Sequence, residues 1–408
     1  MNIYKKQLLA AISSAAMMVS LVSPVAAQTI EISDNGASSD NTADVTSQVT
    51  TAVVQTNVAT VTNSVDSSAS TGSNDANQNT GGDTAIRTGN ADTSATVVND
   101  LNLNQATVDC CEAQETDVLI EGNGVYSENE VELENTRDIS VYQTNVADVS
   151  NDVDAQASTG YNDANQNTGG QVLVSTGDAS TDVEVSTAAN ANWARVGGGS
   201  SDPSSLSARI LGNGAYSDND IDLDNIVTTA LVQTNTADVR NDVDASAKTG
   251  YNDANQNTNG DVLILTGNAD ASVVVDNLVN FNWASIDCGC LTDLSAKISG
   301  NGVYAEDEIE AELQDDRQVF QTSVADLYND VDAKAKTGKN DADQNTGKTE
   351  GIDPVTIWTG DSNSSTTVEN TGNANTFGGF LPEEWPEFDF SFNLSLDWGQ
   401  LQHLLALI

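Results

Sequence analysis

The 408-residue sequence has little positive charge: 14 Lys and Arg stand against 61 Asp and Glu, for a formal net charge of −47 at pH 7. Binding to nucleic acid requires clustered Lys and Arg that neutralise phosphates, so this composition excludes a nucleic-acid partner. The same negative charge argues against docking on an anionic lipid surface.

Histidine is nearly absent, since the chain has only His403, close to its C-terminus. A nucleophile activated by an imidazole base is therefore excluded from the rest of the chain. Paired carboxylates serve glycosidases, but 61 acidic residues bring such pairs together by chance. We expect no enzymatic activity and name no catalytic residue.

Aromatic residues make up only 5% of the chain, too few for a conventional large core. Asn, Thr, Ser, Gly, Ala and Val are abundant instead. This composition leaves two classes of structure, a disordered chain or a β architecture packed with small side chains.

The first 27 residues have the pattern of a Sec-type signal peptide of a prokaryote. Lys5 and Lys6 form a basic region, residues 8–22 an apolar region, and Val25-Ala26-Ala27 a small-residue cleavage site. The apolar region is shorter than the roughly 20 residues of a membrane-spanning helix and ends at Pro24. We expect a secreted or cell-surface protein with no transmembrane segment in the mature chain, where disulfides can persist.

The chain repeats itself four times. Asn-Asp-Ala-Asn-Gln-Asn-Thr begins at Asn74, Asn162 and Asn252, and a variant begins at Asn340, at spacings of 88, 90 and 88 residues. A Gln-Thr pair lies upstream in every copy, at Gln55, Gln143, Gln233 and Gln321. The domains that we predict are the signal peptide 1–27, the repeats 28–115, 116–205, 206–293 and 294–375, and a C-terminal tail 376–408.

Within a copy, apolar and charged residues alternate with a period of two, as in residues 238–249. This alternation predicts strands with one buried and one solvated face. Thr-Gly pairs such as Thr159-Gly160 and Thr176-Gly177 punctuate the strands, and we expect their glycines to supply the positive φ of tight turns. The recurring strand–turn unit of 17–22 residues suits one rung of a β-solenoid.

The predicted fold is an all-β repeat protein with a β-solenoid or β-helix-like stack. Asn63, Asn151, Asn241 and Asn329 occupy one equivalent position, where stacked rungs would let their amides pair in a ladder. Such pairing offsets the cost of burying an amide. The alternative is four tandem β-sandwich domains of about 88 residues each.

The segment Gly160-Tyr161-Asn162-Asp163-Ala164-Asn165-Gln166 resembles curlin-type amyloid repeats. More broadly, residues 34–375 resemble the Asn/Thr/Gly-rich β-strand-repeat surface proteins of bacteria, although curlin-like repeats are shorter and less acidic. The resemblance implies a structural or adhesive role at the cell surface without catalysis, and it carries over no functional site.

Alternating carboxylates follow each Gly-Asn-Gly of copies two to four. They are Glu128, Glu130, Glu132, Glu134, Asp218, Asp220, Asp222, Asp224, Glu306, Glu308, Glu310 and Glu312. On a strand these side chains share one face about 6.6 Å apart and repel one another unless water or a cation intervenes. They form either a solvated acidic face or a Ca²⁺ site, since Ca²⁺ prefers six to eight oxygen ligands.

The four cysteines are disulfide candidates in equivalent loops between repeats: Cys110, Cys111, Cys288 and Cys290. With four or five rungs in each copy, the two loops would lie roughly 40 Å apart, too far for a disulfide or a shared zinc ion. We therefore expect bridges within a loop or between molecules.

The tail contains the most amphipathic strand pattern of the chain. Its apolar positions, Phe388, Phe390, Phe392, Leu394, Leu396 and Trp398, alternate with polar residues. This segment is either a cap on the end of the stack or an assembly strand that docks on a neighbouring subunit.

The sequence therefore predicts a structural or adhesive surface protein that assembles into extracellular filaments or a surface layer. Its expected partners are copies of itself or another cell-surface component. The alternative is a calcium-dependent array of glycan-binding modules, for which Ca²⁺ would be the cofactor.

Overall fold

A computed structural model describes residues 28–109, 115–197, 204–287, 292–347 and 355–378. All regular structure in these residues is β-strand. The predicted signal peptide and almost all of the predicted tail lie outside the described residues. In the part of the chain that is described, no helix is long and apolar enough to cross a membrane.

Each repeat makes one complete turn of a stack, which we call a rung. Rung 1 contains β1 (Gln28–Ser33), β2 (Asp40–Ser70), β3 (Thr84–Arg87) and β4 (Ala91–Val108). Rung 2 contains β5 (Glu115–Glu121), β6 (Glu128–Ser158), β7 (Val172–Ser175) and β8 (Ala179–Gly197). Rung 3 contains β9 (Ser204–Leu211), β10 (Asp218–Lys248), β11 (Val262–Leu265) and β12 (Ala269–Asp287). Rung 4 contains β13 (Thr292–Ser299), β14 (Glu306–Lys336), β15 (Val355–Trp358) and β16 (Ser362–Phe377).

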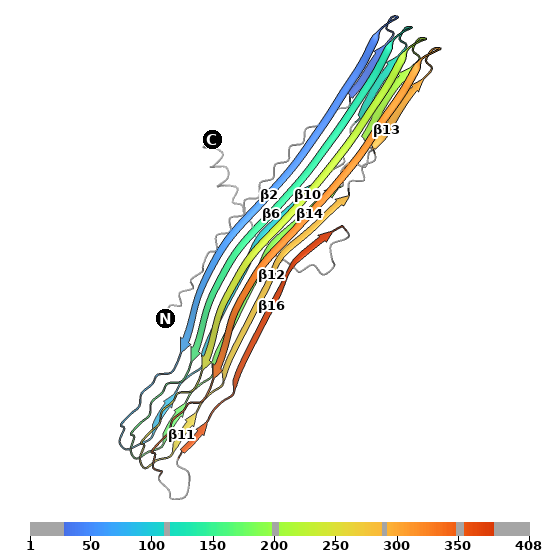
Figure 1. Cartoon of the computed structure of the whole chain (residues 1–408). Coiled ribbons are helices and arrows are strands. Elements are labelled where there is room, and N and C mark those ends of the chain that lie inside the picture. The colour runs from blue at the N-terminus through green and yellow to red at the C-terminus, as the bar shows by residue number, and fades with distance from the viewer. Residues whose placement is uncertain (1–27, 110–114, 198–203, 288–291, 348–354, 379–408) are drawn as a thin grey trace, which may run out of the picture. The chain divides into compact units, whose positions relative to one another are not determined.

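Equivalent strands of successive rungs pair in parallel and in register, which gives four sheets of four strands. The largest, which we call the long sheet, has the order β14-β10-β6-β2, and its four long strands lie side by side in Figure 1. Every copy completes its sheets with strands of the neighbouring copies. The prediction of an all-β solenoid-like stack is therefore confirmed, and the alternative of four separate sandwiches is excluded.

The predicted rung length of 17–22 residues is wrong, because one copy of about 88 residues forms one rung. Partner residues such as Asn63 and Asn151, or Val65 and Val153, are offset by a whole copy. The reason is the length of the main strands: β2, β6, β10 and β14 each run for 31 residues. Alternation persists over this distance without a break, so the chain turns back only twice per copy.

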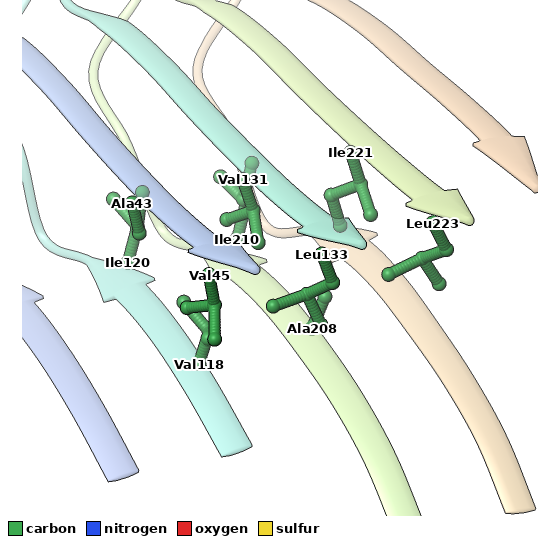
Figure 2. Close-up of a cluster of buried hydrophobic side chains, with 10 residues drawn as sticks. All are labelled: Ala43, Val45, Val118, Ile120, Val131, Leu133, Ala208, Ile210, Ile221 and Leu223. Atoms are coloured by element: carbon green, nitrogen blue, oxygen red, sulfur yellow. The ribbon is translucent and has the colours of Figure 1, made fainter. Parts of the chain in front are cut away.

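The core lies between the long sheet and the sheets formed by the other strands. Figure 2 shows one cluster, in which Ile120 and Val118 of β5 face Ala43 and Val45 of β2. Further along, Val153 of β6 packs in a cluster with Val183 of β8. The inner positions hold mainly Val, Ala, Leu and Ile, as a narrow two-layer interior requires.

Glycine at the predicted turns has another role than the one that the sequence suggested. Gly160 does not have a positive φ, whereas the following Tyr161 has φ 65°. A Cβ atom built on Gly160 would lie 1.7 Å from the carbonyl oxygen of Gly250 in the next rung. Gly160 is therefore required by the close approach of two rungs.

The strands β4, β8, β12 and β16, which we call the return strands, contain a bend at one Asn in every rung. Asn102, Asn190, Asn280 and Asn373 all have φ between 59° and 64°, a left-handed conformation that Asn tolerates better than most residues. Asn190 Nδ2 donates to the carbonyl oxygen of Thr236 (2.7 Å) and to Asn280 Oδ1 (3.0 Å). These bonds hold the bend against the long sheet and link it to the next rung.

Candidate acidic face and assembly edges

The twelve carboxylates predicted as a calcium site form a regular grid on the outer face of the long sheet. The registers Glu128–Asp218–Glu306 and Glu132–Asp222–Glu310 give two of its four columns. The other two are Glu130–Asp220–Glu308 and Glu134–Asp224–Glu312. Neighbours are ~4.8 Å apart between strands and about 6.6 Å apart along a strand. Rung 1 extends two columns with Asp40 and Asp44 and has Thr42 and Thr46 in the others.

The grid is open to solvent, because all twelve residues are exposed except Asp222 and Asp224, which are half-buried. Repulsion raises the pKa of Glu132, first through Asp44, then through partial desolvation and through Asp222, Glu130 and Glu134. At Glu132 the neighbouring carboxylates therefore favour the protonated form or a nearby counterion over the bare charge.

Further carboxylate columns continue along the same strands and into the turn. Desolvation raises the pKa of Asp242, and the carboxylates of Asp330, Asp152 and Asp244 add to this shift. Desolvation also raises the pKa of Asp253, with contributions from Asp163 and Asp341 in the same turn column. Like charges thus repeat at the spacing of the rungs along much of the outer surface.

Within the described ranges, no group of three or more His, Cys, Asp or Glu has an arrangement that could hold a metal ion. The carboxylates form a flat array on one sheet face and do not surround a point. The calcium site stays a prediction. The other interpretation is that the carboxylates attract a diffuse layer of cations without binding any ion at a fixed place.

The inner face carries amide ladders in place of the carboxylates. Asn63 Nδ2 donates to Asn151 Oδ1 (2.8 Å), Asn151 to Asn241 (2.7 Å) and Asn241 to Asn329 (2.7 Å). The predicted ladder is therefore present, and its two central members are almost completely buried. Each amide bridges two rungs and so fixes their register.

Sequence reasoning missed several more ladders on the inner face. Gln143 Nε2 donates to Gln55 Oε1 (2.7 Å), and Gln233 Nε2 donates to Gln143 Oε1 (2.8 Å). A ladder on the return strands contains Asn104, Asn192, Asn282 and Asn375. A signal in the sequence could have found them: identical amides recur at the same distance from the repeated motif, at the alternate positions of the strand that face inward.

The two end rungs leave long edges without a strand partner among the described residues. In every sheet, the strand of rung 1 and the strand of rung 4 pair on one side only. At one inner position, Ile309 of rung 4 is 48% exposed, whereas Ile221 and Val131 of the middle rungs are fully buried. Such edges are templates for further strand pairing.

The rung count behind the predicted distance between the cysteine loops is wrong. One copy makes one rung, so Val108 and Ile286, which precede the loops, belong to a single column two rungs apart. Their separation is about 10 Å, not roughly 40 Å. The four cysteines lie outside the described residues, as do the predicted assembly strand of the tail (Phe388, Phe390, Phe392, Leu394, Leu396 and Trp398) and His403.

Comparison with known proteins gives no match. The chain matches no family model, no curated protein and no solved structure.

Proposed function

We propose that this protein is an exported structural protein of a prokaryotic cell surface, which assembles edge to edge into extracellular filaments or a surface layer. The observation that carries the proposal is the pair of edges at rungs 1 and 4, which have no strand partner among the described residues, since parallel edges without a partner recruit further strands. The signal-peptide pattern of residues 1–27 supports export.

The interior supports a mechanical role. Parallel, in-register stacking with amide ladders is the arrangement that gives cross-β assemblies their stability. Aromatic stacks run in the same direction: the rings of Tyr126 and Tyr216 lie 5.2 Å apart, and those of Trp193 and Trp283 lie 5.1 Å apart. The outer face presents carboxylates and small polar residues, which suits contact with water, cations and glycans. Adhesion would then arise from many weak contacts along a rigid surface.

Negative-stain electron microscopy of the purified protein in calcium-containing buffer tests this proposal. Filaments or sheets with a subunit repeat are expected. Isolated particles at all concentrations and calcium levels would contradict the assembly role. N-terminal sequencing of protein recovered outside the cells that express it tests export, and the expected first residue is Gln28.

The alternative is a calcium-dependent glycan-binding array. A glycan panel with Ca²⁺ and with a chelator separates the two functions. Sugar binding that requires Ca²⁺, by a protein that forms no filaments, would favour this alternative.

A further inference from the structure

The two open edges of the stack match each other. At three inner ladder positions of the long strands and the turn after them, rung 1 and rung 4 have the same amide at the same register: Gln321 corresponds to Gln55, Asn329 to Asn63 and Asn340 to Asn74. Two other columns differ, since Asn57 corresponds to Ser323 and Asn41 to Asp307. On β16, Asn370, Asn373 and Asn375 correspond to Asn99, Asn102 and Asn104 of β4. A rung 1 placed beyond rung 4 would therefore continue these ladders.

The ladders also have a direction. In the Asn63 column, each Nδ2 donates towards rung 4, so Asn329 presents a donor in the direction of the next rung. In the Gln55 column, each Nε2 donates towards rung 1, and Gln321 donates to Gln233 (2.7 Å). A second copy that presents its rung 1 to rung 4 satisfies both directions. Its Asn63 would accept from Asn329, and its Gln55 would donate to Gln321.

The acidic columns distinguish rung 1 from the other rungs. Acidic residues are aligned with acidic residues at eight positions between rungs 2 and 3 and at nine positions between rungs 3 and 4. Only four such positions occur between rungs 1 and 2. Thr42, Thr46 and Ser64 of rung 1 occupy columns that are acidic in every other rung.

A joint of rung 4 on rung 1 would align acids at only four positions. These pairs are Glu306 with Asp40, Glu310 with Asp44, Asp332 with Asp66, and Asp341 with Asp75. Like charges directly opposite each other destabilise a strand pair, so this joint meets less repulsion than two of the three joints within the chain.

One column brings opposite charges together at the same joint. Lys297 of rung 4 corresponds through Arg209 and Leu119 to Glu31 of rung 1. Both Lys297 and Glu31 are exposed on the outer face. Arg209, the partner of Lys297 in rung 3, forms an ion pair with Asp117 of rung 2, diagonally across the strands at 2.7 Å. Among the described residues Lys297 is in no such ion pair, and Glu31 would supply a carboxylate across the joint.

We propose that rung 4 of one copy docks in register on rung 1 of a second copy, so that the filament grows head to tail with one polarity. This inference rests on the proposed function and specifies its partner surface. The 31-residue strand alone offers an edge roughly 100 Å long. With two sheet layers about 10 Å apart, the contact covers about 1,000 Å² per partner. This area is above the ~800 Å² per partner of a standard interface.

A symmetric joint does not satisfy these constraints. Two rung 4 edges brought together by a two-fold axis would either reverse the strand direction or place β14 against β16. In both arrangements the amide columns lose their partners. The head-to-tail joint is the arrangement in which every described sheet continues.

Two single-cysteine variants test the joint in a chain whose four native cysteines are replaced by Ser. Thr62→Cys and Tyr328→Cys lie in one outer column, on rung 1 and on rung 4, and both positions are exposed. Each variant is assembled alone, and the two are assembled as an equimolar mixture, followed by mild oxidation and non-reducing electrophoresis. Random head-to-tail mixing predicts disulfide dimers containing up to about half of the chains in the mixture, and none in either variant alone.

A register control uses Thr60→Cys with Tyr328→Cys. These positions are two residues out of register, so their Cα atoms would be about 8 Å apart, beyond the ~7 Å limit of a disulfide. The yield of dimers should fall several-fold.

Electron microscopy of the same samples separates the two proposals. Filaments without dimers in the Thr62→Cys and Tyr328→Cys mixture, or with dimers of Tyr328→Cys alone, would overturn the head-to-tail joint and leave the assembly function standing. A cysteine-free chain that forms no filaments, where the native chain also forms none, would overturn both.

Discussion

The two faces of the long strands carry stacks of like residues, with opposite consequences. On the inner face, Asn241 donates to Asn329 and accepts from Asn151, because an amide is both donor and acceptor. On the outer face, the adjacent Asp242 lies between Asp152 and Asp330, and these carboxylates only repel. Because each copy forms one rung, equivalent residues stack on one another. The stacked amides therefore stabilise the structure, and the stacked acids destabilise it. The proposed assembly would depend on the balance between the two.

Placing an acid on the inner face should destabilise the protein most. Asn241→Asp removes the amide donor to Asn329 and to Asn277 (3.2 Å) and places a carboxylate where the side chain is fully buried. We expect a loss of about 3 kcal/mol or more in the free energy of unfolding at pH 7. Chemical denaturation measures it, and Asn241→Gln serves as a control that keeps an amide. Equal stability of Asn241→Asp and the native chain would contradict the role of the ladder.

Acid should weaken the outer repulsion. The pKa of Glu132, Asp242 and Asp253 is raised in the folded state, above ordinary values of 4.5 for Glu and 3.8 for Asp. A raised carboxyl pKa contributes stability that is fully present below the unfolded pKa and is lost as the pH rises through the folded pKa. The Tm should therefore increase as the pH falls from 7 towards about 4.5, and filaments should form faster. A Tm that falls steadily over this window would contradict the account.

Divalent cations should act on the same face. A dissociation constant tenfold below the free Ca²⁺ concentration corresponds to about 1.4 kcal/mol of stabilisation. We expect Ca²⁺ to raise the Tm more than NaCl or Mg²⁺ at equal ionic strength if the predicted site binds it. The variant Glu130→Gln/Asp220→Asn/Glu308→Gln removes one column and should reduce the difference. Equal effects of all three salts would show screening and would contradict the calcium site.

The smallest expected effect is that of Asp242→Asn, the outer counterpart of the first variant. Replacing one carboxylate in the column removes repulsion from Asp152 and Asp330 and leaves the amide ladder intact. Because the side chain is solvated, we expect a gain of only about 0.2–0.5 kcal/mol at pH 7, and less in high salt. Thermal unfolding at two salt concentrations measures it. A loss of stability would contradict the assignment of this column as repulsive.

The sequence was sufficient to predict strands, faces and the first ladder, because these depend on local alternation and on the offset between copies. Asn63 and Asn151 share a column whatever the rung length. The rung length itself was not predictable from the Thr-Gly spacing, because Gly160 and Gly177 mark close approaches between rungs as well as turns. That error propagated to the cysteine loops, whose separation depends on the number of rungs per copy.

The acidic residues were found from their two-residue spacing, but their arrangement as a grid follows only from the pairing of β6, β10 and β14. Without that register, four carboxylates on one strand suggest a local cation site. With it, they are four of several acidic columns, and the columns of Asp242 and Asp253 are two others. The complementarity of the two edges likewise depends on which residues of rungs 1 and 4 share a column.

If one copy forms one rung, equivalent residues of adjacent copies lie on neighbouring strands, and the distance between them can be measured. Spin labels on Ser150→Cys and Arg240→Cys, in a chain without its native cysteines, occupy paired positions of β6 and β10, ~4.8 Å apart at the backbone. We expect strong dipolar broadening of the spectrum in the monomeric, doubly labelled chain and none in a chain with either single label. Narrow spectra from the doubly labelled chain would contradict it.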